Sequence, residues 1–125
     1  MNAPFRSAEP QVGRADALDP ATLAELRDLG ADEYQALVRV FRDEAATRVE
    51  SLRADAERGD ARALASDAHS LKGSSASFGA TGLAGLCSAV ETALGEGDAH
   101  GVQRLLQEVA AEHERVRAAL TNELA

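Results

Sequence analysis

The sequence is poor in aromatic residues and cysteine, and each scarcity narrows the kinds of protein it can encode. Only 3% of the 125 residues are aromatic and none is tryptophan. A core must therefore be built from leucine, valine and alanine, the residues of packed helices rather than of sheets. Cys87 is the single cysteine, which excludes an internal disulfide and any zinc site based on several cysteines. We expect Cys87 to be a packing residue and the protein to be cytoplasmic.

Long apolar runs and clusters of basic residues are also missing. No run approaches the roughly 20 apolar residues that span a bilayer, and the first 16 residues lack the apolar segment of a signal peptide. With 21 acidic and 13 basic residues, the net charge of -8 repels nucleic acid and anionic membranes. We therefore expect neither nucleic acid nor a membrane among the partners.

Helix start and stop signals divide the chain into one short and four longer helical segments. Residues 1–17 contain scattered charge and no apolar period, so they are predicted to form a flexible tail before a domain spanning 18–125. Asp19 and Pro20 begin a short helix that ends before Gly30. Four longer segments follow, each with apolar residues three and four positions apart: they run from Asp32 to Gly59, from Asp60 to Gly79, from Leu83 to Leu94 and from Asp98 to Leu120.

The links between these longer segments are short, and short links make neighbouring helices antiparallel. The predicted fold is therefore all-α. It is an antiparallel up-down four-helix bundle with a short additional N-terminal helix that covers one end.

The stretch AHSLKGSSASFG, residues 68–79, interrupts this pattern with the chain's only lysine, a glycine and several serines. At about 100° per residue, one side of its helix faces the core, and His69 lies roughly 140° from the centre of that side. The core side comprises Leu64, Ala68, Leu71, Ser75 and Phe78, and the Ser75 hydroxyl there could bond a carbonyl of the preceding turn. The exposed side carries His69 with Ala65, Gly73 and Ala76, and Lys72 lies at its flank.

The residues on the exposed side suit phosphoryl chemistry. Gly73 within a helix costs about 1 kcal/mol relative to alanine, a cost explained if a second protein must approach closely there. A neutral imidazole is a competent nucleophile near neutral pH, and the Lys72 ammonium could balance the charge of a phosphoryl group. The alternative is a solvated helix face with a small-residue packing site, and the local pattern alone does not decide between the two.

A longer motif resembles a known family. The motif consists of His69-Ser70-Leu71-Lys72-Gly73-Ser74-Ser75, then Phe78-Gly79-Ala80, Leu83, Leu86-Cys87 and Glu91. It resembles the histidine-containing phosphotransfer (HPt) domain of two-component phosphorelays, including the related domain of chemotaxis histidine kinases. The resemblance implies that His69 accepts and donates the phosphoryl group, that Lys72 assists with phosphate charge and that Glu91 orients the imidazole. It also implies that a receiver domain docks over Gly73, with Ala65 and Ala76 beside it.

The implied function is relay of a phosphoryl group between receiver-domain aspartates. The partners would be response-regulator receiver domains and a hybrid histidine kinase, and Mg²⁺ would be held by the receiver, with no cofactor on this chain. We expect a monomeric phosphocarrier without kinase activity, because the sequence has no Gly-x-x-x-x-Gly-Lys-Ser/Thr loop and too little length for an ATP-binding domain.

Other interpretations remain open. The bundle could be a non-catalytic interaction module, or an HPt domain excised from a hybrid sensor kinase, although Met1 and the short tail favour a free-standing protein. A hydrolase is disfavoured because no motif indicates an oxyanion hole or a nucleophile paired with a base. His100 and His113 are expected to be structural, since neither has metal-ligand spacing to a carboxylate or a cysteine.

Overall fold

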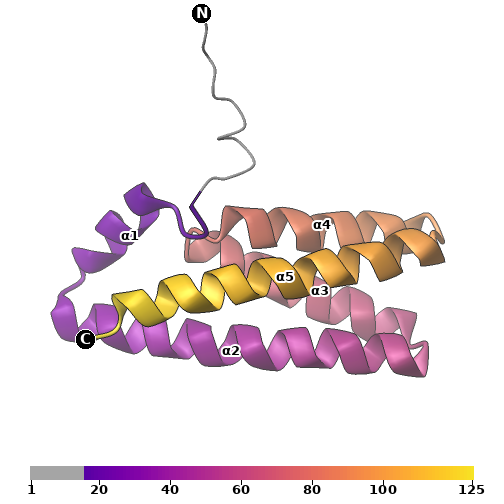
Figure 1. The fold of residues 1–125 in the computed structure, drawn as a ribbon, viewed down its shortest axis with the longest axis horizontal. Coiled ribbons are helices and arrows are strands. Elements are labelled where there is room, and N and C mark those ends of the chain that lie inside the picture. Colours follow the sequence, from indigo (N-terminus) through magenta and orange to yellow (C-terminus); the bar gives the residue numbers. More distant parts are fainter. Residues whose placement is uncertain (1–15) are drawn as a thin grey trace, which may run out of the picture.

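The computed structural model describes residues 16–125, which form helices joined by short links. The helices are α1 (Pro20–Arg27), α2 (Ala31–Arg58), α3 (Ala61–Ser77), α4 (Thr81–Gly95) and α5 (Ala99–Glu123). From α2 onward each helix packs against the next, and α5 returns to α2, so these helices close an antiparallel up-down bundle (Figure 1). The predicted all-α fold is confirmed. Within residues 16–125, no helix combines the length and the apolar character needed to cross a membrane.

Aspartates cap the start of three helices, as the sequence predicts. Each side chain accepts a hydrogen bond from a backbone N–H three residues later, which satisfies one of the free donors of the first turn. The capping pairs are Asp19 with Thr22, Asp60 with Ala63 and Asp98 with Gly101. Helix α2 differs, because it begins at Ala31 after Gly30 and no side chain caps it.

The link between α3 and α4 is joined to the start of α1. Gly79 has a φ of 80°, a left-handed conformation that favours glycine, and it lets the Ala80 N–H donate back to the Ser75 carbonyl at 2.8 Å. A Cβ at Gly79 would lie 2.9 Å from Thr22 Cβ, so the close approach of α1 also requires glycine. The Asp19 N–H donates to the Gly79 carbonyl at 2.8 Å. Helix α1 is thereby fixed at this end of the bundle.

The core is apolar and is filled mainly by leucine, valine and alanine. Aromatic packing contributes where Phe41 of α2 and Phe78 after α3 stack with ring centroids 5.0 Å apart. Ala17 and Leu18 are buried in the same core, so Ala17 of the predicted tail packs with the bundle, while Asp16 is exposed. Residues 1–15 of that tail lie outside the described residues.

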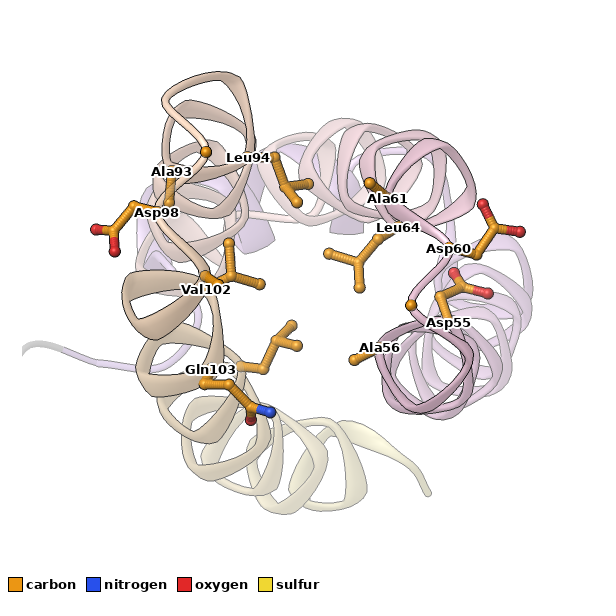
Figure 2. A pocket seen from close by; sticks show the side chains of 14 residues that line it. Asp55, Ala56, Asp60, Ala61, Leu64, Ala93, Leu94, Asp98, Val102 and Gln103 are labelled. Atoms are coloured by element: carbon orange, nitrogen blue, oxygen red, sulfur yellow. The ribbon is translucent and has the colours of Figure 1, made fainter.

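The opposite end of the bundle has an open cavity of about 300 Å³. The aliphatic side chains of Leu64, Leu94 and Val102 point into it (Figure 2), while Asp60 and Asp98 point away toward solvent. Its lining comes from the ends of α2 to α5 and includes no residue of the AHSLKGSSASFG stretch. The cavity is therefore separate from the surface around His69.

Candidate functional site

The side of α3 that carries His69 faces solvent. The His69 side chain is 71% exposed, whereas Ala68, Leu71 and Ser75 on the opposite side are fully buried. This division confirms the helical face predicted from the spacing of the apolar residues. The imidazole therefore projects from a helix that is anchored by its buried side, which keeps the ring accessible while its backbone is fixed.

Glu91 of α4 contacts the imidazole from the neighbouring helix. It follows Val90, which is fully buried, so its side chain leaves α4 at the edge of the interface with α3. Glu91 Oε2 lies 3.0 Å from His69 Nδ1. A carboxylate has only acceptors, so in the neutral imidazole this contact places the proton on Nδ1 and leaves a lone pair on Nε2.

Lys72 meets the same carboxylate, one turn along α3 from His69. Its Nζ lies 2.7 Å from Glu91 Oε1. The nearby Lys72 ammonium lowers the pKa of Glu91, and the bond to His69 adds to this effect while partial burial opposes it. Glu91 is therefore an ionised carboxylate that contacts two groups of α3. The structure brings His69, Lys72 and Glu91 together, as the resemblance implies. The Lys72 ammonium, however, is paired with the Glu91 carboxylate.

The surface beside His69 carries only small side chains that project little from the helix. Gly73 and Ala76 are exposed and Ala65 is half-buried, and a Cβ built at Gly73 would meet no atom within 4 Å. The helix does not need glycine at this position for packing or for a left-handed φ, since Gly73 is not among the positive-φ glycines. The absence of a side chain at Gly73 thus leaves open space beside the imidazole.

The serines after Gly73 are structural. Ser74 Oγ donates to the Ser70 carbonyl at 3.2 Å, and Ser77 Oγ donates to the Gly73 carbonyl at 3.1 Å. Ser75 points into the core as predicted, but its hydroxyl has no hydrogen-bond partner among the described residues. The expected bond from Ser75 to the preceding turn is therefore wrong, and Ser74, on the more open side of the helix, makes that bond instead.

The remaining cysteine and histidines do not extend the site. Burial, with a further contribution from Glu91, raises the pKa of the Cys87 thiol to about 12, so Cys87 is a neutral packing residue. Burial likewise lowers the pKa of His113 on α5, and His100 is exposed at the start of that helix. Residues 16–125 contain no group of three or more His, Cys, Asp and Glu side chains arranged to hold a metal ion.

A helical bundle with an exposed histidine, oriented by a carboxylate and flanked by a lysine and a glycine, is the arrangement expected of a phosphotransfer domain. The sequence model of the family described as Hpt domain matches residues 36–119. The chain therefore belongs to the Hpt domain family, whose members carry phosphoryl groups and interact with receiver domains of two-component systems.

A solved structure of this family is closely similar. It is the crystal structure of histidine-containing phosphotransfer protein B (HptB) from Pseudomonas aeruginosa PAO1, with a TM-score of 0.82 and 36% sequence identity. The similarity covers 87% of this chain and 95% of that one. No match was found among the curated proteins.

Proposed function

We propose that His69 is the phosphoryl acceptor and donor of this phosphorelay protein. The observation that carries the proposal is the 3.0 Å contact between His69 Nδ1 and Glu91 Oε2. It leaves Nε2 as the nucleophilic nitrogen of a ring that is 71% exposed to a partner. The match to the Hpt domain and the similarity to HptB support a carrier role over a passive interaction module.

The transfer step joins Nε2 of His69 to the phosphorus of a receiver's aspartyl phosphate. The N–P bond forms as the P–O bond to aspartate breaks, and the aspartate leaves as a carboxylate. Nδ1 keeps its proton, so the phosphorylated ring carries a positive charge, which the Glu91 carboxylate stabilises. The reverse sequence passes the group to the aspartate of a second receiver.

Lys72 supplies a positive charge close to the reacting nitrogen. In the structure its ammonium lies on Glu91, and a phosphoryl group of about -1.5 to -2 charges on the imidazole would compete for it. Lys72 would then move from the glutamate toward the phosphoryl oxygens. The receiver would provide Mg²⁺ and the remaining catalytic groups, so positioning and charge are this chain's contribution.

The docking surface proposed for the receiver is centred on Gly73, with Ala65 and Ala76 beside it. Small side chains allow the phosphorylated aspartate to come within bonding distance of an imidazole that is attached to a helix. A hybrid histidine kinase is the proposed source of the phosphoryl group, passing it through its own receiver domain to a monomer of this protein.

Phosphoryl labelling tests the proposal directly. Incubation with a receiver domain carrying a radiolabelled aspartyl phosphate should transfer label to this protein as acid-labile, base-stable phosphate. Mass spectrometry under alkaline conditions should place that phosphate on His69. Label on another residue, or no transfer from a panel of phosphorylated receivers, would contradict the assignment.

Removing the Glu91 carboxylate should slow the transfer. Glu91→Ala takes away the acceptor for Nδ1–H and the partner of Lys72, so we expect labelling to slow roughly 10- to 100-fold through lost positioning. Glu91→Gln keeps an oxygen that can accept from Nδ1–H and should retain more activity. The ¹⁵N chemical shifts of His69 should move toward the other neutral tautomer in Glu91→Ala only.

The exposed Glu96 at the end of α4 offers a matched control for Glu91. Glu96→Ala removes a carboxylate from the residue that caps the C-terminus of α4, away from His69, and should leave both the rate and the ¹⁵N shifts unchanged. Wild-type kinetics and shifts in Glu91→Ala would refute a positioning role for Glu91.

A further inference from the structure

Arg62 lies on the same exposed side of α3 as His69, close to the start of the helix. The two residues are seven positions apart in the sequence, which brings them to the same angular position on the helix to within about 20°. The helical rise separates their backbones by roughly 10 Å along the axis. Both side chains are exposed. Arg62 therefore belongs to the surface from which the imidazole projects.

Arg62 differs from the other charged side chains of α3 in having no ion-pair partner within residues 16–125. Lys72 is paired with Glu91 of α4 at 2.7 Å. Asp67, on the other side of the helix, is paired with Arg48 of α2 at 2.8 Å. The charge of Arg62 is therefore available to a group outside this chain.

The fold gives no reason for a cation at this position. Arg62 is the second residue of α3, whose first turn contains no acidic residue. The free N–H groups there give the helix start a partial positive charge, which a cation opposes and a carboxylate favours. The capping residue Asp60 accepts from the Ala63 N–H, and its ion pair is a distant one with Arg58 at 3.8 Å. Neither the first turn nor its cap depends on the Arg62 guanidinium.

The neighbouring surface of α4 contains almost no charge. Within Thr81–Gly95, Glu91 is the single charged residue, and both of its carboxylate oxygens contact groups of α3. The acidic residues that follow this helix, Glu96 and Asp98, form no ion pair with Arg62 in the described part of the chain. Charged residues are depleted from the cores of protein interfaces, whereas arginine is enriched there. An unpaired arginine beside an uncharged surface therefore has the composition of a protein interface.

We propose that Arg62 is a docking residue for the receiver domain and pairs with an acidic side chain near the receiver's phosphorylated aspartate. This inference rests on the proposed function, because it places the centre of docking at His69. Even a weak, transient interface covers about 600 Å² on each partner, a patch that extends roughly 14 Å from its centre. A receiver that docks over His69 therefore also covers Arg62.

The receiver's chemistry explains why a cation is useful at this distance. A receiver holds Mg²⁺ beside its aspartate, and proteins bind Mg²⁺ through carboxylates, so its docking surface is acidic. This chain has a net charge of -8 and repels such a surface. Arg62 opposes that repulsion at the point of contact, which favours association and disfavours partners that lack the acidic group.

Change of charge at Arg62 should impair docking rather than the chemical step. We expect Arg62→Glu to lower kcat/KM for transfer from a phosphorylated receiver about 5- to 10-fold at low salt, mainly through KM, and Arg62→Gln about 2- to 5-fold. At about 1 M salt, where charges are screened within roughly 3 Å, both variants should come within about 2-fold of the wild type. Neither variant should lower the unfolding midpoint in urea, because the Arg62 charge opposes the helix dipole.

Arg104→Glu is the matched control. Arg104 is an exposed arginine of α5 that also has no ion-pair partner among residues 16–125, and α5 packs against α4 and α2. Its reversal changes the net charge of the protein by the same amount as Arg62→Glu. It should lower kcat/KM by less than about 2-fold, since its charge lies away from the surface around His69.

Equal losses in Arg62→Glu and Arg104→Glu would show an effect of net charge alone and overturn the docking role. A loss in Arg62→Glu that falls on kcat, or that persists at high salt, would overturn it as well. These outcomes leave the phosphoryl acceptor His69 unaffected. No transfer to the wild type from a panel of phosphorylated receivers would instead refute the proposed function, and the role of Arg62 with it.

Discussion

Replacing His69 with glutamine is expected to abolish phosphoryl labelling of this protein. Glutamine has no nucleophilic nitrogen, because its amide lone pair is delocalised, so no phosphorylated species can form at this position. The substitution is made on a side chain that is 71% exposed, so the bundle should retain its helical content and unfolding midpoint. Transfer assays and circular dichroism on the same preparation would measure both effects.

His100→Gln is the control for this experiment. His100 is an exposed histidine at the start of α5, whereas His69 lies on α3, which packs chiefly against α2 and α4. Its replacement should leave labelling at the wild-type level. Undiminished labelling of His69→Gln would mean that another residue is the phosphoryl acceptor.

A tryptophan at Gly73 is expected to reduce transfer by about 100-fold, the loss typical of a misplaced reacting pair. The indole would occupy the open space beside the imidazole and hold the receiver away from Nε2. Gly73→Ala should instead change the stability of the helix more than the rate of transfer. Its Cβ meets nothing within 4 Å, so it should stabilise the helix by up to about 1 kcal/mol. The rates of transfer and the unfolding free energies distinguish docking from folding.

Ala118→Trp serves as the matched control for Gly73→Trp, because Ala118 is an exposed small residue of α5. It should transfer phosphate at the wild-type rate. If Gly73→Trp transfers equally fast, the receiver does not approach over Gly73. Gly73→Trp could instead lose its helical structure, which would mean that the glycine serves the fold. Gly73→Ser, a smaller change, then decides the matter: the docking role is refuted unless this variant also slows transfer.

Much of the fold can be predicted because its signals are local. Asp19, Asp60 and Asp98 each begin a helix by capping a backbone N–H three residues away, and this needs no knowledge of the rest of the chain. The exposed orientation of His69 also follows from the period of one helix. The capping residues and the helix period can both be recognised within a short segment of the sequence.

Contacts between helices are less accessible to such reasoning. The pairing of Lys72 with Glu91 depends on how α3 crosses α4, and a helix period alone leaves the ammonium free to point elsewhere. The pairing of Arg48 of α2 with Asp67 of α3, 2.8 Å apart, depends on the α2–α3 interface in the same way. The burial of Asp55 is closer to a local signal, because Asp55 follows the buried Leu52 by three residues and so takes a core-facing position.

Cys87 gives the protein a built-in reporter of bundle opening. Its side chain is fully buried and its thiol is kept neutral by burial, so a thiol-reactive dye has neither access nor a thiolate to attack in the closed bundle. Modification therefore requires the helices around α4 to separate. Because Cys87 is the single cysteine of the sequence, each modified molecule has undergone such an opening. The rate of dye incorporation therefore measures local opening of the native bundle beneath the surface around His69.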